Sequence, residues 1–81
     1  MIVSVKLFAA AKEIVGTPEL TVELPANGDV SVLKQRMQEQ FPALAPLLSR
    51  SSFAVNQQYV TDQFSLSAEH EIAFIPPVSG G

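Results

Sequence analysis

One long amphipathic helix in a short chain restricts the fold more than any other feature of this sequence. Val30, Leu33 and Met37 recur at helical spacing over residues 30–40, and Asp29 precedes them as a favourable N-cap residue. A helix with one apolar stripe must bury it against another element, and 81 residues provide one core for doing so. The sequence therefore predicts a two-layer α+β domain in which this main helix covers one face of one sheet.

The segments on both sides of the helix alternate between apolar and polar residues, as strands do. In the first segment, Val3, Val5 and Leu7 form an aliphatic set that we expect to face the helix. The other expected elements are a short helix over 9–15, strands over 19–24, 53–55, 59–60 and 71–75, and an irregular helical segment over 43–49. We expect the first two strands to pair antiparallel, and the apolar first and last strands to lie parallel at the centre of a mixed sheet. That order is the β-grasp arrangement.

Composition and charge exclude several classes of function. The net charge is −3 with only five basic residues, so no phosphate-binding surface and no nucleic-acid partner are expected. No apolar stretch approaches the ~20 residues of a membrane span, and no signal peptide precedes the first strand, so we expect no membrane partner and a cytoplasmic location. The absence of cysteine excludes a thiolate nucleophile within the chain. His70 lies between Glu69 and Glu71, but successive strand residues point to opposite faces, so we expect no metal site there.

The last six residues are the most distinctive segment of the chain, and we separate them as a C-terminal tail, 76–81, from a β-grasp domain over 1–75. Pro76 and Pro77 favour an extended backbone, and at ~3.1 Å per residue the tail would reach on the order of 18 Å beyond the sheet. The glycines that follow have no side chains, so a terminal carboxylate on Gly81 would fit a narrow channel. This pattern suits activation as an acyl-adenylate, although a frayed end or a cloning scar would also end in glycine.

Strand parity predicts an apolar surface beside the tail. Because the odd-numbered residues of the first strand face the helix, Phe8 is expected on the opposite face or at the strand end. The same reasoning points Ile75 outward in the last strand, and parallel pairing brings it close to Phe8. Tyr59, just past a turn, is a third candidate. Together they suggest a docking surface, and the alternative is that Phe8 and Tyr59 are core or scattered surface residues.

Several segments of the sequence resemble one known family. They are residues 5–9 (Val-Lys-Leu-Phe-Ala), Lys12 and Glu13 with Gly16, residues 55–57 (Val-Asn-Gln) with Val60, and residues 72–81 (Ile-Ala-Phe-Ile-Pro-Pro-Val-Ser-Gly-Gly). They resemble the small subunits of molybdopterin synthase, within the ubiquitin-like sulfur carriers, and the likeness covers essentially the whole chain. The Pro-Pro pair favours this branch over the thiamine-pathway carriers, which share the terminal glycines. Residues 68–71 depart from the Asp-Gly-Asp that the family often has there.

The resemblance implies a mechanism and a set of partners. A ubiquitin-activating-like enzyme would adenylate the Gly81 carboxylate, so that Gly81 carries AMP and then, after reaction with a sulfur donor, a thiocarboxylate. The chain would dock on the large subunit of molybdopterin synthase, in a heterotetramer, and donate sulfur to a cyclic pyranopterin precursor. It would bind no resident cofactor and catalyse nothing alone. The residues expected at the partner interface are Phe8, Tyr59, Ile75, Pro76, Pro77, Val78 and Ser79, with Gly80 and Gly81 as the reacting end.

Other functions stay open from the sequence. The chain could carry sulfur for thiamine, tRNA thiolation or a tungsten cofactor, in which case the copurifying partner would identify the pathway. It could be a ubiquitin-like protein modifier whose Gly81 forms isopeptide bonds, and lysine-linked conjugates would show this. A non-covalent interaction module with an incidental Gly-Gly ending is the last alternative.

Overall fold

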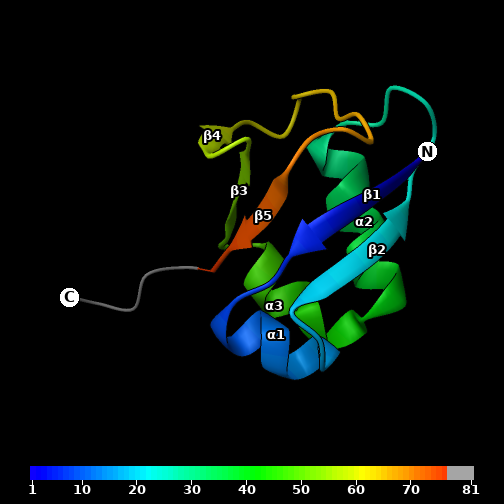
Figure 1. Cartoon of the computed structure of the whole chain (residues 1–81). Coiled ribbons are helices and arrows are strands. Elements are labelled where there is room, and N and C mark those ends of the chain that lie inside the picture. The colour runs from blue at the N-terminus through cyan, green and yellow to red at the C-terminus, as the bar shows by residue number, and fades with distance from the viewer. Residues whose placement is uncertain (77–81) are drawn as a thin grey trace.

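The computed structural model describes residues 1–76, and the predicted helices and strands are all present in it (Figure 1). Along the chain they are β1 Ile2–Lys6, α1 Ala9–Val15, β2 Glu19–Glu23, α2 Val30–Gln40, the 3-10 helix η1 Pro42–Leu44, α3 Ala45–Leu48, β3 Ser52–Val55, β4 Gln58–Val60 and β5 Ile72–Ile75. The irregular helical segment expected over 43–49 is therefore the pair η1 and α3, which have Pro42 and Pro46 in their first turns.

The strands form one mixed sheet in the order β2-β1-β5-β3-β4. β1 pairs with β2 antiparallel and with β5 parallel, with Val5 opposite Ile72 and Lys6 opposite Ala73. β3 is antiparallel to both β4 and β5. The expected parallel pairing of the first and last strands is confirmed, and both have a neighbour on each side. This is the predicted β-grasp arrangement, a mixed sheet with one main helix on one face.

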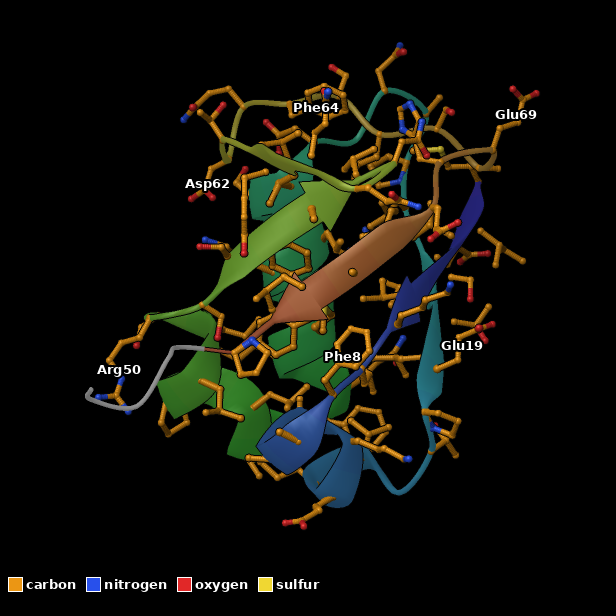
Figure 2. All side chains as sticks on the ribbon, turned by 60° about the vertical axis from the view of Figure 1, so that its left-hand side comes forward. Phe8, Glu19, Arg50, Asp62, Phe64 and Glu69 are labelled. Carbon is orange, nitrogen blue, oxygen red and sulfur yellow. The ribbon has the colours of Figure 1, made fainter. Side chains whose placement is uncertain are left out.

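The core lies between α2 and the inner face of the sheet. Val30, Leu33 and Met37 of α2 are fully buried, as the helical spacing predicted. Opposite them, the aromatic rings of Phe53 and Phe74 lie with their centroids 5.1 Å apart, within the favourable range for ring pairs. The other face of the sheet is not covered by a helix in the described part of the chain (Figure 2).

The N-terminus of α2 is fixed by Asp29 and by the loop over 61–71. The Asp29 carboxylate accepts hydrogen bonds from the Ser31 hydroxyl (2.6 Å) and the Val32 amide (3.0 Å), so its pKa is lowered, chiefly by Ser31 and then by Val32. The loop supplies two backbone carbonyls for amides that the helix leaves unpaired: Val30 N–H donates to Phe64 (3.1 Å) and Ser31 N–H to Asp62 (3.0 Å).

The turn between β3 and β4 is tighter than expected. The predicted strands over 53–55 and 59–60 leave three residues for the turn, but only Asn56 and Gln57 form it, and Gln58 already pairs with Val55. Both turn residues have positive φ, 50° and 70°. Two consecutive residues of that kind close a two-residue hairpin whose twist matches that of the strands. The expectation was wrong because nothing but Asn56 signals a left-handed residue here.

Candidate functional site

The described part of the chain ends just past the central strand β5. It ends beside the face of the sheet that no helix of the described residues covers, which we call the open face. Ile75 is the last residue of β5, and Pro76 follows it, both half-buried. The remaining predicted site residues, Pro77, Val78, Ser79, Gly80 and Gly81, lie outside the described residues. The structure therefore describes the surface next to the start of the tail.

Phe8 lies two residues past the end of β1, on this open face, and is 46% exposed. The register pairs Lys6 with Ala73, so continuing two residues along both parallel strands brings Phe8 beside Ile75. Phe8 also caps α1: its carbonyl accepts from the amides of Ala11 (3.1 Å) and Lys12 (3.3 Å). These contacts fix the backbone of Phe8, and Figure 2 shows the ring lying over the sheet near the end of β5.

Tyr59 shares the open face but does not lie next to Phe8. It is 72% exposed on the edge strand β4, where it is opposite Ala54, and Ala54 is in turn opposite Ala73 of β5. Two alanines thus connect Tyr59 to the neighbourhood of Ile75. We call Phe8, Ala54, Tyr59, Ala73, Ile75 and Pro76 the apolar strip.

The sequence analysis missed the contribution of Ala54. This residue is 8% exposed yet lies outside the core cluster, which shows that it belongs to the open face of the sheet. The same strand parity that pointed Ile75 outward would have found Ala54, because Phe53 and Val55 on either side are core residues. Ala73 lies on the same face by the same parity, opposite Ala54, and it is half-buried.

Polar side chains border the strip on the side of β1 and β2. Lys6 lies in the same row as Ala73, and its ammonium nitrogen is 3.3 Å from the Glu71 carboxylate. On the neighbouring strand, the Glu19 carboxylate accepts a hydrogen bond of 2.6 Å from the Ser4 hydroxyl. The strip therefore has the layout of a protein interface, with apolar residues at its centre and hydrogen-bonded charges at its rim.

The side chains of residues 1–76 form no recognisable catalytic set. No group of three potential metal ligands is found within this part of the chain. The imidazole Nδ1 of His70 accepts from the Ser67 amide (3.0 Å), and its ring lies 5.6 Å from that of Phe64, so His70 holds a turn together. Across the same residues, no helix is both long enough and apolar enough to pass through a membrane. The apolar strip is thus the feature of the described fold that best suits a function.

Solved structures with the same fold define the class of protein. The small archaeal modifier protein SAMP1 from Haloferax volcanii superposes with a TM-score of 0.85 over 100% of both chains, at 24% identity. SAMP1 from Methanosarcina acetivorans gives 0.81 at 28% identity, covering 99% of this chain and 96% of that one. The chain is therefore a ubiquitin-like β-grasp protein.

Sequence comparison places the chain more narrowly. A model of the ThiS family matches residues 5–81, so the chain belongs to the ThiS family. A relative from Caenorhabditis briggsae is 43% identical over 81 residues, covering 98% of this chain and 96% of its own. A human relative is 38% identical, with 98% and 93% covered. Both relatives carry the name molybdopterin synthase sulfur carrier subunit.

Proposed function

We propose that this chain is the sulfur-carrier subunit of a molybdopterin synthase and that it works through the carboxylate of Gly81. The observation that carries the proposal is the ending Pro-Pro-Val-Ser-Gly-Gly, attached directly to the central strand β5 beside the apolar strip. Relatives that bear this function in their names are 32–43% identical to the chain over nearly its whole length. A tail that extends from a rigid strand, next to a docking surface, suits delivery of a reactive group into another protein.

The proposed chemistry uses the main-chain terminus. A carboxylate oxygen of Gly81 attacks the α-phosphorus of ATP in a ubiquitin-activating-like enzyme, which forms the acyl-adenylate and releases pyrophosphate. Hydrosulfide released by a sulfur donor then attacks the carbonyl carbon, the bond to AMP breaks, AMP leaves, and the thiocarboxylate remains after loss of the proton. The sulfur of that group attacks a carbon of the pyranopterin precursor and displaces an oxygen substituent from it, and hydrolysis of the resulting thioester leaves the sulfur on the pterin and returns the Gly81 carboxylate. The side chains of this protein supply docking, so we expect no resident cofactor and no catalysis by the chain alone.

The apolar strip is the proposed contact with the large subunit, in a heterotetramer. A structure of the same fold from Helicobacter pylori is a complex of subunits 1 and 2 of molybdopterin-converting factor, and it superposes with a TM-score of 0.69 at 21% identity. We propose Phe8, Tyr59 and Ile75 as anchors, because Phe8 and Tyr59 are exposed aromatic side chains, which give much of the binding energy when an interface covers them, and the half-buried Ile75 lies beside Phe8. Pro76, Pro77, Val78 and Ser79 would lead Gly80 and Gly81 into the partner, in the cytoplasm.

The experiment that tests this function is reconstitution with purified partners. The protein, once converted to its thiocarboxylate, should form molybdopterin when mixed with the large subunit and the pyranopterin precursor. A variant with one alanine added after Gly81 should fold normally and form none, because its reacting carboxylate is displaced and bears a side chain. Full activity of that extended variant would show that the terminal carboxylate is not the reacting group.

A second function is favoured by one observation. The SAMP1 structure at 28% identity belongs to a protein named as a modifier, and conjugation to lysine would use the same activated Gly81. In that case an amine displaces AMP and an isopeptide bond forms. Mass spectrometry of lysine residues carrying a C-terminal fragment of this chain, in cells that express it, separates the two functions.

A further inference from the structure

A pocket of about 350 Å³ opens where β1, α1 and the start of β2 meet, next to the apolar strip. Its apolar wall includes Phe8, Ala9 and Pro18, and its charged groups are Lys6, Lys12 and Glu19. Phe8 belongs both to this pocket and to the apolar strip. A protein that covers the strip therefore also reaches the pocket.

The three charged groups of the pocket differ in how they are already engaged. Lys6 is paired with Glu71 at 3.3 Å, and Glu19 accepts the Ser4 hydroxyl at 2.6 Å. Lys12 is exposed and has no ion-pair partner within residues 1–76. Its ammonium group is thus the charge in the pocket wall that is available to a ligand.

The backbone of Lys12 is held firmly. Its amide donates to the Phe8 carbonyl (3.3 Å), and its carbonyl accepts from the Gly16 amide (2.8 Å). Gly16 has φ of 90°, the left-handed conformation that ends α1. Lys12 therefore projects from a fixed point, and less conformational entropy is lost when its ammonium binds a partner.

We propose that this pocket is a second anchor point of the docking surface and receives an acidic side chain of the large subunit. The carboxylate pairs with the Lys12 ammonium, while the methylene groups of the same side chain lie against Phe8 and Pro18. Of the two lysines that line the pocket, Lys6 is already paired with Glu71, whereas Lys12 has no ion-pair partner within residues 1–76, so an incoming anion can pair with Lys12. Glu13, next to Lys12 in α1, lines no part of it. The inference rests on the proposed function and adds the partner's chemistry at one position.

The test compares affinities for the large subunit, measured by titration calorimetry. We expect Lys12→Glu to weaken binding by about tenfold or more, Lys12→Gln by about threefold, and Lys12→Arg to bind like the wild type. Arg36→Glu is the matched control: it makes the same change in net charge on α2, which covers the other face of the sheet, and should change the affinity less than about twofold. Thermal unfolding of each variant verifies that the fold is intact.

The outcomes separate this inference from the function on which it rests. Wild-type binding that Lys12→Glu leaves unchanged, with sulfur transfer intact, would overturn the pocket inference alone. Tighter binding of Lys12→Glu would show that the pocket receives a cation and would also overturn it. A wild-type protein that does not bind the large subunit would overturn both. A single Glu→Lys or Asp→Lys change in the large subunit that restores binding to Lys12→Glu would identify the acidic partner.

Discussion

At the scale of single residues, Asp29 and Phe8 fix the starts of the helices α2 and α1. Asp29 accepts two hydrogen bonds at the start of α2. Phe8 anchors the first turn of α1 through its carbonyl and leaves its ring exposed. Asp29 was predictable from the sequence because an N-cap residue has a local signature, whereas the positive φ of Ala9 (48°), directly after Phe8, has none.

Replacement of Asp29 should show its role as a cap and its dependence on pH. The pKa of the folded carboxyl is lowered by the Ser31 hydroxyl and the Val32 amide, so its stabilisation is complete above the unfolded pKa and is lost as the pH falls through the folded pKa. Asp29→Ala should lower the melting temperature at neutral pH. Asp29→Asn, which keeps a capping oxygen without the charge, should lower it less. Melting curves recorded from neutral to acid pH should show that the difference in melting temperature between the wild type and Asp29→Asn becomes smaller as the pH falls. A difference in melting temperature that stays constant with pH would contradict this account.

Replacement of Phe8 should separate docking from folding. Phe8→Ala should weaken binding of the large subunit by about tenfold or more, because a buried aromatic anchor is lost from the interface. The melting temperature should change little, since the ring is 46% exposed in the free protein. Ile2→Ala is the control: Ile2 is 59% exposed at the other end of β1, away from the tail, and its loss should leave binding unchanged. Equal effects of the two substitutions would argue against a localised surface.

At the scale of elements, the sequence predicted correctly the strands and the helix whose apolar residues recur at regular spacing. It gave the wrong turn length where the turn lacks the residues that usually form it. β1, β5 and α2 were predicted with the correct inner faces, because alternation and helical spacing each leave one side apolar. The hairpin over β3 and β4 was predicted with too long a turn, because Gln57 is an unusual residue at a φ of 70°. Tyr59 could not be placed from its sequence alone, since its distance from Phe8 depends on the strand order.

The strained turn predicts a stabilising substitution. Gln57→Gly should raise the free energy of unfolding by up to about 1 kcal/mol, because glycine adopts the left-handed conformation without a Cβ clash. Gln58→Gly, one residue further and within β4, should instead destabilise the protein, because glycine weakens a strand. Urea titrations of both variants measure this. Destabilisation by Gln57→Gly would mean that the side chain of Gln57 stabilises the fold by more than the positive φ of this residue destabilises it.

At the scale of the whole molecule, the folded core and the proposed reacting group belong to different parts of the chain. The core cluster runs from Val3 to Phe74. The proposed chemistry lies on Gly81, beyond the described residues. The sequence predicted the core from its periodicity, which the structure confirms, whereas the reacting tail, inferred from proline and glycine residues, stays a prediction. It could not show the pocket at Lys12, because that pocket forms only where three elements meet in space.

Removal of residues 77–81 should therefore abolish sulfur transfer without loss of stability. A chain that ends at Pro76 retains the core cluster described for residues 1–76 and the pairing of β5 with β1 and β3. Its melting temperature should match that of the full chain within error. A fall of many degrees would show that the tail contributes to folding as well as to chemistry.

The most direct test of the central claim is the intact mass of the protein after incubation with ATP, its activating enzyme and a sulfur source. The account predicts a gain equal to the exchange of one oxygen atom for sulfur, located at Gly81 by fragmentation and absent when Gly81 is deleted. No change in mass with an activating enzyme of demonstrated activity would contradict it, and so would a gain located on any other residue.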